Sequence, residues 1–325
     1  MLSKSLHRFL RPLLLLSIAI AMMCSTVAAQ DQGANGQEPA IVYNNQLWLP
    51  LVGNTTAANS AAPSVLDDDL ALVQSSQVAG QPMSVIVILK DQADVRTVAG
   101  ADRRERRRNL VKLLRDKADG TQGNLRLQLA KWRNQGQVQS FTPLWIINAF
   151  AVNATSAVID RLAQAPEVKE ILLDVTLQGP PAPTASTATP EQNLTVVNAP
   201  ALWNLGFLGQ GIVVANMDTG VDATHPDLAP RWRGGSNSWY DPYGQHGTPT
   251  DLNGHGTWTM GLMVGGSSGG TAIGVAPQAQ WIAVKIFNDS GSATASAIHQ
   301  GFQWLLDPDG NPATADAPDI VNNSW

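Results

Sequence analysis

An aspartate and a histidine stand where an acid and a base are best placed to act together. Asp218 follows a nearly continuous apolar run at residues 211–217, and His255 begins a stretch of helical character at residues 255–265. A carboxylate can orient an imidazole, which can then take a proton from a hydroxyl group, a poor nucleophile without such a base. Histidine suits this task because its pKa lies near neutral pH. The pair therefore predicts acid-base chemistry that activates a nucleophile.

Each of these two motifs is weak by itself. Asp-Thr-Gly, at residues 218–220, is also typical of aspartic proteases, in which two carboxyl groups share one proton. A homodimer would supply the second carboxyl group in that alternative. His-Gly-Thr, at residues 255–257, has little meaning alone. The two motifs in this order and context favour the oriented imidazole base.

The elements that must position these side chains are typical of an α/β domain. Residues 211–217 and 281–287 are nearly continuous apolar runs, which suit parallel strands buried on both faces. Residues 255–265 and 294–306 are expected to form helices, and residues 319–323 to begin another strand. Functional groups in such sheets gather at the carboxyl ends of the strands, which is where the aspartate falls.

Four ordered blocks within residues 199–325 resemble the subtilases, a family of serine endopeptidases, in the form of their bacillopeptidase F-like members. The blocks are Val213–Asp222 with Thr224–Leu228, Asp251–Thr257, Gly274–Pro277 with Ala283–Ile286, and Pro318–Trp325. The resemblance implies a subtilisin-like parallel sheet, protein or peptide substrates, and no required cofactor. By the same resemblance, Asp218 and His255 are the aspartate and histidine of an Asp-His-Ser triad.

The resemblance also implies substrate-binding residues. Ser290, Gly291 and Ser292 are expected to pair with the substrate backbone as an added strand. Ser324 and Trp325 are expected to line the pocket for the residue before the scissile bond. One departure from the family pattern is Trp258, which stands where many members have a second histidine; we expect no effect on catalysis.

The nucleophile of the family is missing from these residues. Neither its Gly-Thr-Ser block nor its oxyanion asparagine occurs in the 325 residues. We therefore expect this polypeptide, as given, to be inactive, and the sequence to be a C-terminally truncated piece of a longer enzyme.

A smaller α+β domain is predicted before the catalytic part. Its expected elements alternate as β-α-β-β-α-β, the order of ferredoxin-like domains. They are strands at residues 83–89, 138–141, 145–152 and 168–175, a helical stretch at 101–133 interrupted near Gly120 and Gly123, and a helix at 156–163. Residues 82–178 also resemble the inhibitory propeptide of the subtilases.

The remaining segments are predicted to serve export and processing. Residues 1–29 have a basic start, an apolar run too short to span a bilayer and small residues at 27–29, as in a secretory signal peptide. The mature protein is thus expected to be secreted and extracellular, without a stable membrane anchor. Residues 30–81 are interpreted as a low-complexity extension. The proline-rich residues 179–191 are interpreted as a linker and processing region, leaving 192–325 as the N-terminal part of the catalytic domain.

The two domains carry net charges of opposite sign. Residues 82–178 hold 15 basic and 10 acidic residues, whereas residues 191–325 hold 3 basic and 11 acidic ones. Opposite charges favour docking, so the expected partner of the catalytic part is its own propeptide. The arginine run at residues 103–108 has no interleaved aromatic residues, and we expect no nucleic-acid binding.

Two alternatives concern metals, and two concern function. His225 and His246 lie in glycine- and proline-rich loops and are not assigned as metal ligands. Residues 307–311 are interpreted as a turn rather than a calcium loop because the closing glutamate is missing. Calcium is possible in this family, but the sequence predicts no site for it. The alternative functions are a secreted propeptide-type inhibitor or folding helper, and a catalytically dead binding module.

Overall fold

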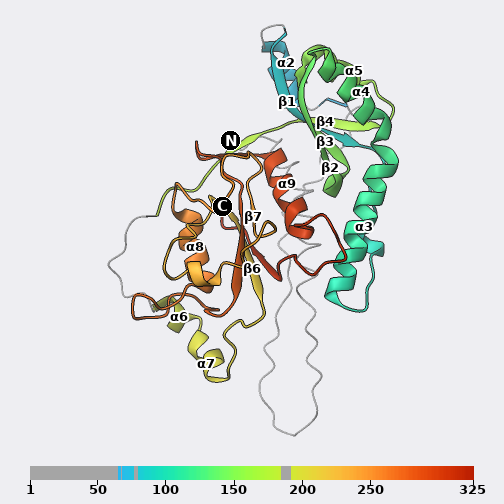
Figure 1. Ribbon diagram of the computed structural model, residues 1–325. Coiled ribbons are helices and arrows are strands. Elements are labelled where there is room, and N and C mark those ends of the chain that lie inside the picture. The colour runs from blue at the N-terminus through green and yellow to red at the C-terminus, as the bar shows by residue number, and fades with distance from the viewer. Residues whose placement is uncertain (1–64, 67, 77–79, 184–191) are drawn as a thin grey trace, which may run out of the picture.

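The computed structural model describes residues 65–66, 68–76, 80–183 and 192–325, which form two main sheets (Figure 1). The predicted signal peptide, most of the predicted extension and residues 184–191 of the predicted linker lie outside these described residues. In the described ranges no helix has the length and apolar character needed to cross a bilayer.

The first sheet is antiparallel, with the strand order β2-β3-β1-β4. Its strands are β1 (Pro82–Leu89), β2 (Val138–Leu144), β3 (Ala149–Thr155) and β4 (Val168–Leu173). Helices α3 (Arg103–Thr121) and α4 (Gly123–Asn134) join β1 to β2, and α5 (Ser156–Ala163) joins β3 to β4.

Strand β1 is buried because both of its faces are covered. On one face, Val85 and Val87 share a core with Leu129 of α4 and Ile159 of α5. On the other face, Ile86 and Ile88 contact a cluster that includes Ala295, a residue of the C-terminal half. Alternation of side chains along one strand thus ties this sheet both to its own helices and to the rest of the molecule.

The helical stretch divides at Gln122, between α3 and α4, which confirms the predicted interruption near Gly120 and Gly123. Two other expectations for this half differ from the structure. The second of the two middle strands begins only at Ala149, because Trp145–Ile147 form a 3₁₀ turn and Asn148 has a φ of +40°. The end of the predicted extension is folded: α2 (Asp68–Ser76) places the fully buried Leu70 in the core of this sheet.

The second sheet is parallel, with the order β10-β6-β8-β7, which confirms the predicted α/β class of this part. Its strands are β6 (Val213–Asp218), β7 (Trp239–Tyr240), β8 (Gln280–Lys285) and β10 (Ile320–Asn322). Helix α8 (His255–Val264) covers one face and α9 (Ala295–Leu306) the other. Helices α6 (Gln192–Val196) and α7 (Ala199–Asn204) precede this sheet.

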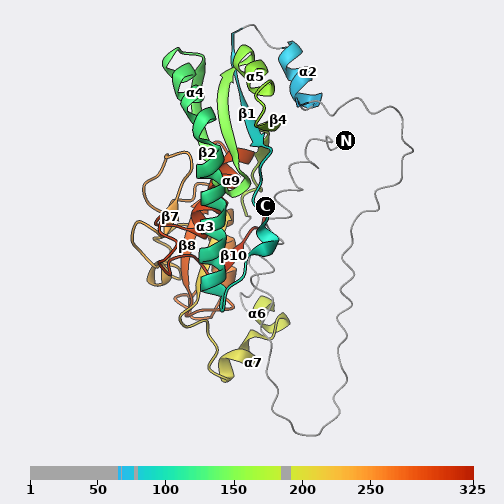
Figure 2. The ribbon, with the colours of Figure 1, turned by 90° about the vertical axis from the view of Figure 1, so that its right-hand side faces the viewer.

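The two halves of the chain meet along α3 and along a short pair of strands. Helix α3 extends beyond the first sheet and lies beside the second one (Figures 1 and 2), where its Leu110 and Leu114 share a core with Ile298 and Phe302 of α9. Strand β5 (Thr176–Gln178) pairs with β9 (Ser292–Thr294) in an antiparallel ribbon. The N-terminal half therefore contributes both a helix and a strand to the surface of the C-terminal half.

Candidate active site

Asp218 is the last residue of β6, and its side chain is fully buried. The backbone N–H of Thr219 donates to Oδ1 of this carboxylate at 2.6 Å. The next residue, Gly220, has a φ of +120°, and a Cβ there would lie 1.9 Å from the carbonyl oxygen of Thr250. Only glycine fits at this turn, which brings the end of β6 against the segment that leads to α8.

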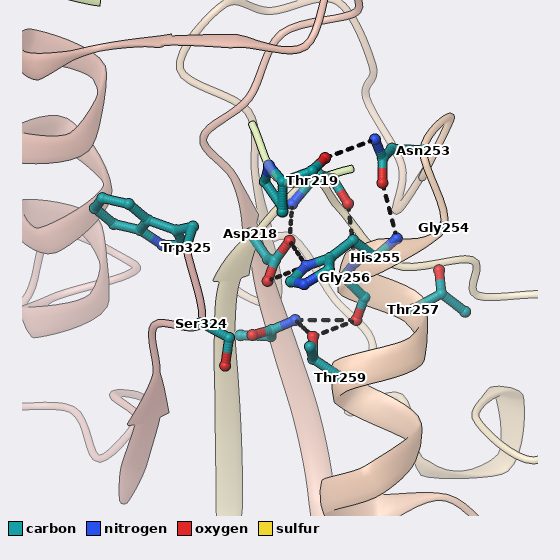
Figure 3. Close-up of polar contacts among 12 residues, drawn as sticks. Asp218, Thr219, Asn253, Gly254, His255, Gly256, Thr257, Thr259, Ser324 and Trp325 are labelled. Atoms are coloured by element: carbon teal, nitrogen blue, oxygen red, sulfur yellow. Dashed lines mark hydrogen bonds and ion pairs between the residues drawn. The ribbon is translucent and has the colours of Figure 1, made fainter. Parts of the chain in front are cut away.

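His255 is the first residue of α8 and faces this carboxylate (Figure 3). Its Nδ1 lies 2.9 Å from Oδ1 and 3.0 Å from Oδ2 of Asp218. Because the acid faces Nδ1, the carboxylate favours the tautomer with its proton on that atom and leaves Nε2 as the proton acceptor. The imidazole side chain is 12% exposed, so it is not sealed off from the surface.

The start of α8 is held in place by Asp251. Its Oδ2 accepts hydrogen bonds from the backbone N–H and the hydroxyl of Thr257, at 2.9 and 2.7 Å. Its Oδ1 accepts from Thr219 Oγ1 and from the backbone N–H of Gly254. Burial alone would raise the pKa of Asp251, but these bonds outweigh it and leave the pKa below the ordinary value. An ionised carboxylate at this helix N-terminus fixes where α8 begins and thereby positions His255, its first residue.

Burial also raises the pKa of Asp218, and the hydrogen bonds from His255 and Thr219 oppose this rise only in part. A carboxyl group whose pKa is higher in the folded state holds its proton more tightly when folded. Its ionisation therefore lowers the free energy of unfolding as the pH rises through the folded-state pKa. The buried charge is a cost to stability at neutral pH, as is common at functional sites.

We therefore expect Asp218→Asn to be more stable than the parent protein at pH 7, by on the order of 1 kcal/mol. The gain should disappear well below pH 3.8, the ordinary pKa of aspartate, because the carboxyl group is then neutral in both states. Urea unfolding at both pH values measures this difference. Equal stability of the two proteins at pH 7 would show that the buried charge carries no cost.

The predicted substrate residues divide between two places. The carbonyl oxygen of Gly291 accepts from the backbone N–H of Gly179 at 2.7 Å, and Ser292 is paired with Gln178 of β5. Ser290 is not part of this ribbon, since its hydroxyl and backbone N–H both donate to Asn288 Oδ1. The predicted substrate-binding strand is thus occupied by a segment of the same chain.

Ser324 and Trp325 follow β10, near the end of β6 that carries Asp218 (Figure 3). The indole Nε1 of Trp325 donates to the carbonyl oxygen of Met217 at 2.6 Å, and its ring meets that of Phe287 edge to face. Ser324 Oγ exchanges hydrogen bonds with Asn322.

Two buried polar residues that the sequence analysis did not single out hold these elements together. Asn216 of β6 donates to the carbonyl oxygen of Gly256 at 3.0 Å and accepts from Asn322 of β10 at 2.9 Å. Lys285 of β8 donates from Nζ to the carbonyl oxygens of Thr219 and Phe287, at 3.1 and 2.8 Å. The sequence did carry a signal for both residues, because each is a polar residue inside an apolar run. A buried amide or amine at such a position needs hydrogen-bond partners.

The remaining candidates are separate from this pair. Asp289, which begins an Asp-Ser-Gly triplet that sequence reasoning missed, has its carboxylate 2.9 Å from His246 Nε2 and 3.6 Å from Lys285 Nζ. It therefore has its own partners and shares no proton with Asp218. His225 Nδ1 accepts from the backbone N–H of Asp227. Among the described residues, neither His225 nor His246 belongs to a cluster that could hold a metal.

An α/β sheet whose strand end carries a buried carboxylate, oriented on a histidine at the next helix, is the arrangement found in serine peptidases of the Asp-before-His order. Residues 209–325 match the Subtilase family. This chain belongs to the subtilase family.

Several subtilases are similar to this chain. Bacillopeptidase F of Bacillus subtilis (strain 168) is 33% identical over 279 residues, which cover 78% of this chain and 19% of that protein. Subtilisin Savinase of Lederbergia lenta is 44% identical over 108 residues, or 33% of this chain and 38% of that protein. The intracellular serine protease of Paenibacillus polymyxa is 37% identical over 116 residues, or 36% of this chain and 35% of that protein. This chain thus spans about a fifth of bacillopeptidase F and little more than a third of the other two proteins.

Proposed function

We propose that this chain carries the aspartate and histidine of a secreted serine endopeptidase, joined to an inhibitory propeptide. The observation that carries this proposal is the contact of Asp218 with His255 Nδ1, in a domain whose strand β9 is paired with β5 of the N-terminal half. In this role His255 Nε2 takes the proton of a serine hydroxyl as that hydroxyl attacks a peptide carbonyl. Asp218 holds the imidazole tautomer and stabilises the charged imidazolium. The substrates would be proteins or peptides.

The serine itself is not among these residues. None of the serines in the sequence stands in a Gly-Thr-Ser block, and the oxyanion asparagine is likewise missing. We propose that a polypeptide of these 325 residues alone does not hydrolyse peptide bonds, because removal of the nucleophile leaves only residual catalysis.

Residues 82–178 are proposed to be the inhibitory propeptide. Support comes from the element order β1-α3/α4-β2-β3-α5-β4 and the sheet order β2-β3-β1-β4, which are those of a ferredoxin-like domain. The 279-residue similarity to bacillopeptidase F is too long to be confined to residues 209–325 and so includes part of this domain. We propose that residues 1–29 are the signal peptide that exports the precursor.

The proposed mode of inhibition is occupation of the substrate-binding strand. Residues 176–179 pair with β9 as a substrate backbone would, and the chain then continues past the proposed catalytic histidine. The carbonyl oxygen of Pro180 accepts from Asn253 Nδ2 at 3.2 Å, two residues before His255. Gly291 and Ser292 would hold a substrate in the same way, and Ser324 and Trp325 would line the adjoining side-chain pocket. Cleavage within residues 179–191 would separate the two domains.

The experiment that tests this proposal uses purified residues 82–178 and a mature subtilase such as Subtilisin Savinase, with hydrolysis of a chromogenic peptide as the readout. We expect inhibition that competes with the peptide. Leu177→Glu should weaken it by at least about tenfold, because this side chain packs against the apolar cluster of Ala293, Ile298 and Phe302.

Leu127→Glu is the matched control for charge, because this side chain is 73% exposed on α4 and has no place in the ribbon of β5 and β9. Circular dichroism confirms that each variant is folded. If folded residues 82–178 leave the protease fully active, the propeptide assignment is wrong.

A further inference from the structure

The backbone of β9 and its neighbouring residues forms hydrogen bonds along two edges. On the edge that faces β5, the carbonyl oxygen of Gly291 accepts from the backbone N–H of Gly179 at 2.7 Å, and the N–H of Ala295 donates to the segment before β5 at 3.0 Å. Successive residues of a strand direct their backbone groups to opposite sides. The carbonyl oxygen of Ser292 and the N–H of Thr294 therefore point away from the edge where a substrate would pair.

This second edge of β9 is covered by the hydroxyl group of Tyr243, a residue of the loop after β7. Its Oη accepts from the backbone N–H of Thr294 at 3.1 Å and lies 3.4 Å from the carbonyl oxygen of Ser292. The same atom lies 3.1 Å from the carbonyl oxygen of Ile286, directly after β8. Burial raises the pKa of Tyr243, so the phenol keeps its proton and donates it to these carbonyl oxygens. One hydroxyl group thus takes the place where a further strand would pair.

The loop that carries Tyr243 also binds the turn before β9. His246 Nε2 lies 2.9 Å from Oδ1 and 3.1 Å from Oδ2 of Asp289, and the backbone N–H of Asp289 donates to Gln245 Oε1 at 3.0 Å. Within the loop, Asp241 Oδ2 accepts from the backbone N–H groups of Gln245 and His246, both at 2.9 Å. Residues 241–246, here called the bracing loop, therefore contact both the strand and the turn that leads into it.

We propose that the bracing loop aligns the substrate-binding strand from behind, with Tyr243 as its main positioning residue. This inference rests on the proposed function, because it requires that β9 and the residues before it pair with the substrate backbone. A strand that is already ordered binds an extended peptide more tightly, since no conformational entropy is lost in ordering it on binding. Tyr243 contacts β9 on the edge away from the substrate, so it acts without touching the substrate.

The consequence is a division between substrate binding and chemistry. The hydrogen bonds to the Asp218 carboxylate come from Thr219 and His255, and none comes from the bracing loop. Loss of the Tyr243 hydroxyl group should therefore weaken the binding of extended peptides and leave the reaction at His255 nearly unchanged.

The first test is native-state hydrogen exchange of the full chain, resolved residue by residue, for the parent and for Tyr243→Phe. We expect the N–H of Gly179 to exchange at least about fivefold faster in the variant, although the deleted hydroxyl group lies on the other edge of β9. Amides of β6 should keep their parent rates. Tyr240→Phe is the matched control, because the hydroxyl group of that tyrosine bonds to Gln300 of α9 and not to β9.

The second test separates positioning from a general structural role, in a mature enzyme that combines residues 192–325 with the nucleophile. For a peptide long enough to pair along β9, Tyr243→Phe should raise KM at least about fivefold and change kcat less than about twofold. For a substrate with a single residue before the scissile bond, neither constant should change.

Unchanged exchange at Gly179 would overturn the proposal, as would equally faster exchange in β6 or a loss of kcat on both substrates. If circular dichroism shows that Tyr243→Phe is unfolded, Asp289→Asn, which breaks the ion pair with His246, replaces it under the same criteria. The exchange measurement needs neither a nucleophile nor inhibition, so its failure is distinct from failure of residues 82–178 to inhibit a subtilase.

Discussion

Replacing His255 by alanine is expected to lower kcat by about 10⁶-fold in a mature enzyme that combines residues 192–325 with the nucleophile and lacks the proposed propeptide. In the proposed mechanism the imidazole is the base that makes the serine reactive, so its loss would leave only the contribution of substrate binding and polar groups. Asp218→Ala should cost less, about 10⁴-fold, because the base remains and loses only its orienting partner at 2.9 Å. Hydrolysis of a peptide substrate under single-turnover conditions measures both effects.

The control for this prediction is His225→Ala. The ring nitrogen Nδ1 of that histidine accepts a hydrogen bond from the backbone N–H of Asp227 and is not bonded to Asp218 or His255, so we expect kcat to change by less than about tenfold. A His255→Ala enzyme that retained activity within that range would show that another group is the base.

Gly220→Ala is expected to destabilise the fold by more than about 4 kcal/mol. Two costs combine: alanine rarely adopts a φ of +120°, and its Cβ would lie 1.9 Å from the backbone carbonyl oxygen of Thr250. That oxygen belongs to the main chain next to Asp251, so relief requires the whole approach to α8 to move. The change should therefore also separate Asp218 from His255.

Gly247→Ala is the matched control. This glycine lies in the segment before α8 that also contains Thr250, it has no positive φ, and a Cβ added to it would have no other atom within 4 Å. Urea unfolding of both variants measures the difference in free energy. A Gly220→Ala protein as stable as Gly247→Ala would mean that the turn after β6 can adopt another conformation.

The sequence predicted those parts of the candidate site whose position follows from neighbouring residues in the chain. Asp218 ends a run of apolar residues and His255 opens a helix, and both positions are visible without knowledge of distant contacts. The parallel sheet was predictable for the same reason, since strands buried on both faces are apolar throughout.

What the sequence did not predict depends on distant partners. Trp145–Ile147 are as apolar as a strand, but Asn148 ends the turn in a left-handed conformation and donates to Asp91 and Thr121 from elsewhere in the chain. Leu70 lies in a polar segment, and only its contact with the first sheet makes it a core residue. Residues 307–311 do form a turn, yet the contribution of Asp316 and Arg115 to the surroundings of that turn appears only in three dimensions.

If residues 82–178 inhibit as proposed, the ribbon of β5 and β9 makes latency depend on dilution. While the backbone is continuous through residues 179–191, the blocking strand is tethered beside its groove at an effective concentration on the order of millimolar. A single cut converts that intramolecular contact into an encounter between two molecules. After that cut, the fraction of enzyme that stays inhibited would depend on the concentration of the released piece. Activity would therefore appear soonest where the surrounding volume dilutes that piece most.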